Sequence, residues 1–371
     1  MASIGKHLES PETSIDSYAR RAQIALGEAL GARKAIYLDT RYWILLRKAN
    51  AGGGSVDAGE LLHMLRKGIR EQRLFCPISE SVFMELMKQS DHSSRKATAL
   101  LVDELSIGVT LIAPQQRIAT ELASFLYRQS GIEDLHPLEH LVWTRLSCVL
   151  GTMHPSQTPF DSATELAMQK GFFDYLWTMP LTKLVETIEA QQPPKDEFET
   201  ATAAINEAIT KHADTIRSFQ QAYSSEVRGV VDITCDAIPD ILVAIARTKG
   251  IAVNEPTPKE RSSGLAMFRN LIAAALERGK ARDQLRSMHI YASLHASLRW
   301  NKGRKLTAND LFDFQHAIAA LGYSDVFLTE KPLQVMVTDK HLALDKMYDC
   351  KVISDTTEAV SSIASLLDEG D

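Results

Sequence analysis

The chain of 371 residues carries 47 acidic and 41 basic side chains, a formal net charge of −6, and 45% of its residues are hydrophobic. This composition excludes a disordered or collagen-like chain, and its acidic balance gives no overall basic signature of nucleic-acid binding. Four scattered cysteines without a C-x-x-C pair predict a reduced, intracellular protein without a cysteine metal site. Because the first residues lack a signal-peptide core and no apolar run approaches the roughly 18 residues that span a bilayer, we expect a cytoplasmic protein without a membrane partner.

Hydrophobic periodicity predicts alternating strands and helices over the first 130 residues. A leading helix is expected over 12–30, and the last helix of this part over 115–129. The expected strands between them are residues 35–38, 73–76 and 108–114. This alternation favours a parallel sheet with helices on both faces.

The strand pattern stops between residues 131 and 280, where helical segments alternate with polar, proline-containing loops. We interpret this stretch as a helical insertion. A helix that opens at Thr307 then precedes two further expected strands, 325–329 and 351–354. The predicted fold is therefore α/β, a doubly wound parallel sheet of about five strands with a large all-α insertion. Its expected divisions are residues 1–130, 131–280 and 281–371.

Four acidic residues lie where these elements would bring them to one edge of the sheet. Asp39 ends the first expected strand, and Glu330 follows the strand at 325–329. Glu85 lies on the helix after the second strand, and Asp313 lies in the first turns of the helix that opens at Thr307. Ligands of open parallel sheets bind at the carboxyl ends of the strands, so these acids can converge. Clustered carboxylates suit Mg²⁺ or Mn²⁺, which activate water and offset charge on a phosphoryl group.

Four short motifs resemble those of the PIN-domain nucleases, metal-dependent enzymes that cut RNA and occasionally DNA. The motifs are IYLDT, SESVFMELMK, DFQHAIAA and VFLTEK. The resemblance implies a PIN-like fold in which the four acid positions, and hence the catalytic residues, are Asp39, Glu85, Asp313 and Glu330. Among these, Asp39, Glu85 and Asp313 would hold the metal. The fourth acid of the family is usually an Asp after a Thr-x step, so Asp325 is the alternative to Glu330 as a metal ligand.

Two further features bear on this hypothesis. Residues 278–305 hold eight basic side chains against the single acid Asp283, a pattern equally typical of a solvated helix face and of a strip that contacts phosphates. The candidate nucleic-acid contacts are Arg299, Lys302, Arg304 and Lys305. Tyr291 and Trp300 could stack on bases, although core packing explains them as well. His316, three residues after Asp313, is interpreted as a local ion or hydrogen-bond partner rather than a catalytic base.

The expected function is that of a divalent-metal-dependent endonuclease, with Mg²⁺ or Mn²⁺ as cofactor and single-stranded or structured RNA as partner. One alternative is an inactive PIN-like binding or assembly module, with the helical insertion as the surface for a protein partner or a second copy. A haloacid-dehalogenase-like phosphatase is a further alternative. That class needs a second Asp two residues after the first, and Asp39-Thr40-Arg41 argues against it.

Overall fold

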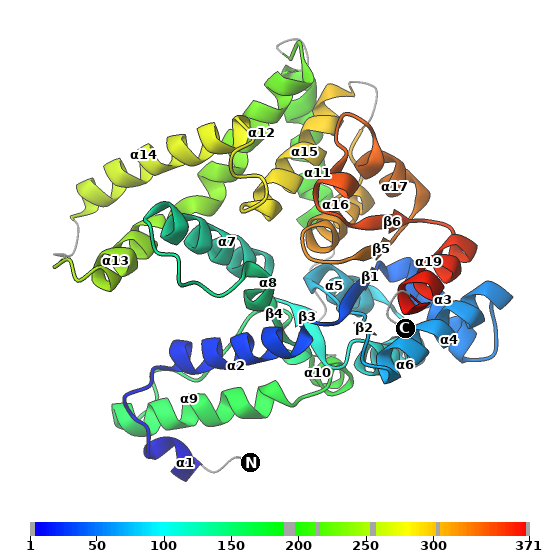
Figure 1. Ribbon diagram of the computed structural model, residues 1–371, viewed down its shortest axis with the longest axis horizontal. Helices are drawn as coiled ribbons and strands as arrows, with labels where there is room; N and C mark the ends of the chain where they lie inside the picture. Colours follow the sequence, from blue (N-terminus) through cyan, green and yellow to red (C-terminus); the bar gives the residue numbers. More distant parts are fainter. Residues whose placement is uncertain (1–3, 189–196, 213–215, 253–256, 302–304, 369–371) are drawn as a thin grey trace.

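The computed structural model describes residues 4–188, 197–212, 216–252, 257–301 and 305–368. Within these residues, the central sheet is parallel and has the strand order β2-β1-β5-β6 (Figure 1). Its strands are β1 (Lys34–Leu38), β2 (Leu74–Phe75), β5 (Val326–Leu328) and β6 (Lys351–Ile353). Leu38 pairs with Leu328, and Leu328 pairs with Ile353, so β1, β5 and β6 end side by side. Residues that follow these strands therefore meet at one edge.

The expected count of five strands in one sheet is not borne out. The third expected strand, β3 (Val109–Leu111), pairs antiparallel with β4 (Trp143–Arg145) in a separate two-stranded sheet. A single bridge between Ile78 and Thr110 links this small sheet to the chain just after β2. Because β4 is only three residues long and lies among helical patterns, it shows no alternation that sequence reasoning could detect.

Both faces of the central sheet are covered, since every residue of its strands except Lys34 and Lys351 is buried. Helix α4 packs against α19 and β2, and α16 packs against α5 and β5. The helices that surround the sheet are α3 (Thr40–Asn50), α4 (Val56–Arg70), α5 (Glu80–Lys88), α6 (His92–Leu105), α16 (Ala308–Leu321), α17 (Lys331–Thr338), α18 (Leu344–Met347) and α19 (Thr356–Asp368).

A further group of helices lies on the side of β4, next to the hydrophobic core that contains the strands of the central sheet. These helices are α1 (Ile4–Leu8), α2 (Ile15–Leu30), α8 (Leu138–Leu141), α9 (Ser162–Trp177) and α10 (Leu181–Ile188). Buried Leu138, Leu181 and Val185 belong to the same core as the strands of the central sheet. Helices α8 and α10, which lie within residues 131–280, therefore contribute to the core of the central sheet.

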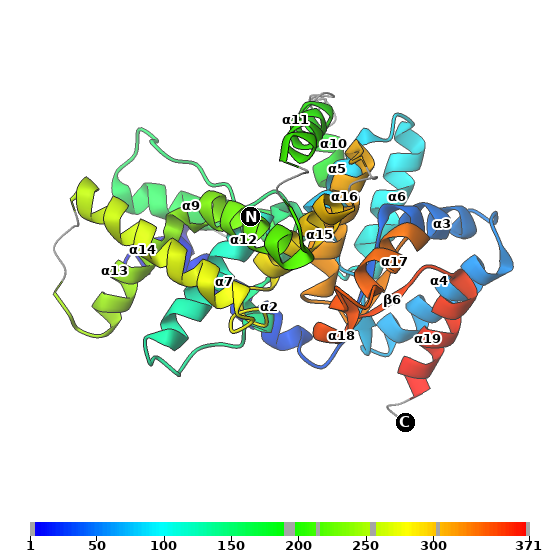
Figure 2. The ribbon, with the colours of Figure 1, turned by 90° about the horizontal axis from the view of Figure 1, so that it is seen from above.

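A second hydrophobic core is all-helical. Its helices are α7 (Pro114–Gln129), α12 (Phe219–Thr234), α13 (Ile238–Thr248), α14 (Pro258–Glu277) and α15 (Arg286–Trp300). Figure 2 shows α13 and α14 at the end of the molecule opposite α4 and α19. Two of the helices in this core, α7 and α15, lie outside residues 131–280. Helix α11 (Glu197–His212) packs against α16.

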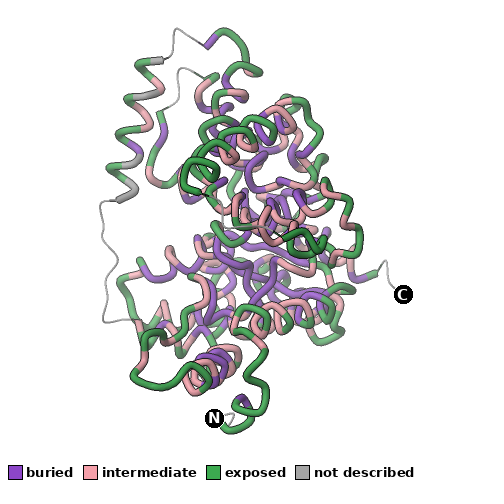
Figure 3. Tube along the Cα trace, turned by 90° about the vertical axis from the view of Figure 1, so that its left-hand side faces the viewer, coloured by how far each residue is buried: buried purple, intermediate pink, exposed green. Residues whose placement is uncertain are grey.

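Buried positions concentrate in the middle of the molecule, while the outlying segments are mostly exposed or half-buried (Figure 3). None of the described helices is both long and apolar enough to cross a lipid bilayer.

Candidate acidic site at the carboxyl edge of the sheet

Asp39 is fixed at the junction between β1 and α3. It is the N-cap of α3, and its Oδ1 accepts the backbone N–H of Tyr42 at 3.1 Å, which satisfies one of the free amides of a helix start. Its own N–H donates to the carbonyl of Leu328 in β5 at 3.0 Å. The residue is only 5% exposed. Burial raises the pKa of Asp39, and the nearby charge of His316 partly opposes this shift.

Glu85 on α5 is held by two side chains from other elements. Its Oε2 lies 2.6 Å from Nε2 of His316 on α16 and accepts the hydroxyl hydrogen of Thr40 at 2.5 Å. Burial alone would raise the pKa of Glu85, but the hydrogen bond and charge of His316, together with Thr40, lower it below its ordinary value. Glu85 is therefore a paired, ionised carboxylate.

His316 continues into a buried chain of hydrogen bonds. Its ring is 2% exposed, and Nδ1 lies 2.9 Å from the hydroxyl oxygen of Tyr37 in β1. That oxygen lies 2.6 Å from the hydroxyl of Ser79, which is the N-cap residue of α5 but makes no side-chain capping bond. Burial raises the pKa of Tyr37 far above its ordinary range, so the phenol keeps its proton. The chain Ser79–Tyr37–His316–Glu85 joins β1, α5 and α16 beneath the acids.

Asp313 lies on α16, whose start is set by a capping box between Thr307 and Asp310. The pKa of Asp313 is raised to about 6, chiefly by burial and also by the charges of Asp39, Glu330 and Asp310, whereas His316 opposes this shift. Repulsion by Asp39 and Glu330 is the electrostatic sign that these carboxylates face a common region.

Glu330 follows β5 and forms the N-cap position of α17 without a side-chain capping bond. It is exposed, and its charge also raises the pKa of Asp39. Asp39 and Glu330 thus follow the carboxyl ends of β1 and β5, and the charges of both raise the pKa of Asp313, whereas Glu85 is paired with His316 on the helix that carries Asp313.

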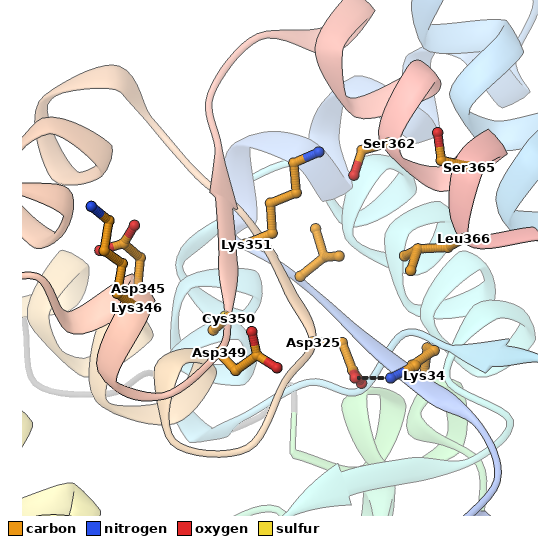
Figure 4. Close-up of a pocket in the computed structure, with 11 residues that line it drawn as sticks. Lys34, Asp325, Asp345, Lys346, Asp349, Cys350, Lys351, Ser362, Ser365 and Leu366 are labelled. Carbon is orange, nitrogen blue, oxygen red and sulfur yellow. Dashed lines mark hydrogen bonds and ion pairs between the residues drawn. The ribbon is translucent and has the colours of Figure 1, made fainter. Parts of the chain in front are cut away.

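Asp325 does not lie with these acids. The expectation that it could replace Glu330 as the fourth acid is wrong. It precedes β5, so it lies at the opposite, amino-terminal edge of the sheet. Its Oδ1 accepts Lys34 Nζ and its Oδ2 accepts the N–H of Ala35, both at 2.8 Å. Figure 4 shows Asp325 with Lys34 in a pocket that also contains Asp349 and Lys351. Asp325 therefore has a structural role between β1 and β5.

A divalent cation such as Mg²⁺ needs several oxygen ligands placed around one point. Among the described residues, no three His, Cys, Asp or Glu side chains stand in positions that could hold a metal ion. In this arrangement His316 and Thr40 occupy Oε2 of Glu85. Asp39, Asp313 and Glu330 carry carboxylate oxygens, the hard donors that Mg²⁺ and Mn²⁺ prefer.

The basic strip expected over residues 278–305 is partly neutralised by acids from elsewhere in the chain. Arg299 donates to Glu226 at 2.6 Å and to Ser225 at 2.9 Å, and its side chain is 19% exposed. Arg286 likewise pairs with Glu139 at 2.6 Å. Arg299 is therefore paired within the protein, and its expected contact with phosphate stays a prediction. Lys305 is exposed, whereas the expected contacts Lys302 and Arg304 lie outside the described residues.

Sequence reasoning missed Thr40, Tyr37 and Ser79. A signal existed for Tyr37, because a tyrosine inside an apolar strand carries a hydroxyl that needs a partner when buried. His316 was expected to act as an ion or hydrogen-bond partner, and it does so, but toward Glu85, which is 231 residues away.

A scan against protein-family models found no match, and searches of curated proteins and of solved structures found none either. The functional proposal therefore depends on the geometry of the site and on the motif resemblance.

Proposed function

We propose that this protein is a divalent-metal-dependent endonuclease that hydrolyses phosphodiester bonds in RNA, with a PIN-like arrangement of its acids. One observation supports the proposal: Asp39 and Glu330 follow two parallel strands at their carboxyl ends, and the charges of both raise the pKa of Asp313 on α16. This is the edge at which open parallel sheets bind ligands. The strand order β2-β1-β5-β6 supports the proposal because it places β1, and with it Asp39, inside the sheet.

Asp39, Asp313 and Glu330 would hold Mg²⁺ or Mn²⁺. When bound, such an ion lowers the pKa of a water molecule and offsets the charge that develops on the phosphoryl group. Asp39 is kept in place by its helix cap and its hydrogen bond to β5. Asp313, with its pKa raised to about 6, can take up a proton near neutral pH. Glu85 acts as a positioning residue, because its bonds to His316 and Thr40 tie α5 to α16 and α3.

A second candidate function is an inactive PIN-like module that binds a partner without cleavage. The close pairing of Glu85 with His316 favours it, since one of the four expected acids already has a cationic or hydrogen-bonding partner. The two candidates differ in one measurable property, which is divalent-dependent cleavage.

The deciding experiment is incubation of the full chain with end-labelled single-stranded RNA and DNA of the same sequence, in Mn²⁺, in Mg²⁺ and in excess chelator. We expect cleavage of RNA only with a divalent ion, and loss of cleavage in Asp39→Asn and Asp313→Asn. Asp16→Asn is the matched control, because Asp16 is an exposed aspartate in the first turn of α2, outside the site. Cleavage that survives chelator contradicts the metal mechanism, and absence of cleavage under every condition favours the binding module.

A further inference from the structure

A surface groove of about 950 Å³ lies between the start of α12, the carboxyl end of α15 and the segment that follows α17. Buried Ile216 and Leu342 contribute apolar surface to it, together with partly buried Phe219. Trp300 forms part of its wall and is 47% exposed, and Arg217 and His341 are exposed lining residues. The groove therefore combines an accessible indole ring with cationic or ionisable side chains.

This combination has a specific chemical use. An aromatic face beside an arginine is typical of sites that bind single-stranded nucleic acid, where a base stacks on the ring and the cation contacts the backbone. Arg217 forms no ion pair with the other described residues, in contrast to Arg299 on the neighbouring helix. Asp339 also lines the groove, and its Oδ1 accepts the N–H of His341 at 2.8 Å. The negative charge of Asp339 repels a phosphate at that end of the groove. A base is therefore the part of a nucleotide expected there.

The groove lies one helix length from the acidic site. Glu330 is the N-cap of α17 and Asp339 is its C-cap, nine residues later. At 1.5 Å per residue this corresponds to about 13 Å along the helix axis. Helix α16, which carries Asp313, packs against both α15 and α17. The acidic site and the groove therefore lie at opposite ends of α17.

We infer that this groove is a subsite for single-stranded RNA, in which a base stacks on Trp300 and an adjacent phosphate contacts Arg217. The inference rests on the proposed function for the identity of its ligand, and it adds that the substrate is an unpaired strand, because a stacked base must be free of its complement.

The test uses the full chain with oligo(A) and oligo(U) ten-mers in excess EDTA, so that binding is measured without cleavage. Of the four tryptophans, Trp300 is the exposed one at 47%, whereas Trp43 and Trp143 are buried and Trp177 is half-buried. Base stacking should therefore quench tryptophan emission in the wild type and much less in Trp300→Phe. Binding is measured in parallel by fluorescence anisotropy with labelled ten-mers. We expect Trp300→Ala to weaken affinity at least about fivefold and Trp300→Phe to retain most of it.

Arg217→Gln should lower the slope of log affinity against log salt by about 0.7, the value for one phosphate contact on a single strand. Two matched controls, Tyr175→Ala and Arg247→Gln, remove an exposed aromatic ring and an exposed arginine from α9 and α13 and should leave binding unchanged.

The failures of the two proposals are distinguishable. Wild-type cleavage with unchanged affinity and unchanged KM in Trp300→Ala overturns the groove and leaves the nuclease proposal standing. Trp300-dependent binding without cleavage in any divalent ion overturns the nuclease proposal and supports the groove as a binding site. Binding of double-stranded RNA in preference to both ten-mers also overturns the groove assignment.

Discussion

Nε2 of His316 and Oε2 of Glu85 lie 2.6 Å apart, although the two residues are 231 positions apart in the chain. The pair joins α16, which carries Asp313, to α5 in the first half of the chain. Because His316 is 2% exposed and Glu85 is largely covered, solvent screens the interaction weakly. This contact holds together the two halves of the sequence on which the acidic site is built.

The first prediction concerns the strength of this contact. His316→Ala and Glu85→Ala should each lower the free energy of unfolding by about 1–3 kcal/mol, because each leaves a buried polar partner unsatisfied. The double variant should cost less than the sum, with a coupling energy of about 0.5–3 kcal/mol in a double-mutant cycle followed by urea unfolding.

The exposed pair Lys96–Glu186, with nitrogen and oxygen 3.0 Å apart, is the matched control for that cycle. Its coupling should be much smaller, because solvent screens both partners. Strictly additive costs for His316 and Glu85 would mean that the two side chains do not interact in solution.

A second prediction separates Asp325 from the acidic site. Asp325→Asn should lower the free energy of unfolding by about 1 kcal/mol, because it weakens the bonds to Lys34 and to the N–H of Ala35. It should leave cleavage and any metal-induced stabilisation unchanged, since it lies at the opposite edge of the sheet. If an Asp325→Asn protein loses cleavage although its melting temperature shows that it is folded, Asp325 belongs to the catalytic site after all.

Much of the sheet could be predicted because its signals are local. Buried runs such as residues 35–38 and 326–328 are apolar and are flanked by residues that stop a strand, and all five expected strands are present in the structure. Their partners could not be predicted. Periodicity shows that residues 108–114 form a strand, but its pairing with β4 depends on contacts that no local pattern encodes.

The acidic site divides in the same way. Asp39 and Glu330 could be placed because each follows a strand, and the carboxyl ends of parallel strands share an edge. The environment of Glu85 could not be predicted, because a lone Glu on a helix gives no indication that its carboxylate will pair with His316. Charge counting over 278–305 failed for a related reason: Glu226 and Glu139, which neutralise Arg299 and Arg286, lie far away in sequence.

A third prediction follows from the pairing of Arg299. Arg299→Gln should destabilise the fold by about 1–3 kcal/mol, because Glu226 would lose a charged partner in a site where both side chains are mostly covered. It should leave the salt dependence of RNA binding unchanged. Lys305→Gln is the matched comparison, because Lys305 is exposed. A lower salt slope in Arg299→Gln alone would show that this arginine leaves Glu226 to contact phosphate.

A fourth prediction tests the metal directly and needs no substrate. Mg²⁺ or Mn²⁺ should raise the melting temperature of the wild type, by a stabilisation of about 2.7 kcal/mol when the free ion is at one hundred times its Kd. Asp39→Asn and Asp313→Asn should show a smaller shift, because each removes a ligand, whereas Asp16→Asn should keep the full shift. Differential scanning calorimetry at fixed ionic strength is the measurement. Equal shifts in all four proteins would mean that the ion binds elsewhere.

The last prediction is a pH dependence that originates at Asp313. Its pKa is raised from 3.8 to about 6 in the folded protein, first by burial and then by neighbouring carboxylates. Between these two values the folded state holds more protons than the unfolded state, so the free energy of unfolding should fall as the pH rises through this window. Solvent screening of a partly exposed group reduces the effect, and we expect about 1–2 kcal/mol.

Asp313→Asn cannot ionise, so without divalent ions it should lack this decline and should melt a few degrees above wild type at pH 7. At pH 4 the two proteins should melt at nearly the same temperature. Urea unfolding and thermal melts of both proteins, from pH 4 to 8 in chelator, measure the free energy of unfolding and the melting temperature. If Asp313 instead stabilised the start of α16 as an ordinary helix-terminal carboxylate, the variant would melt below wild type at pH 7. That result would mean that Asp39, Asp313 and Glu330 do not repel one another in solution.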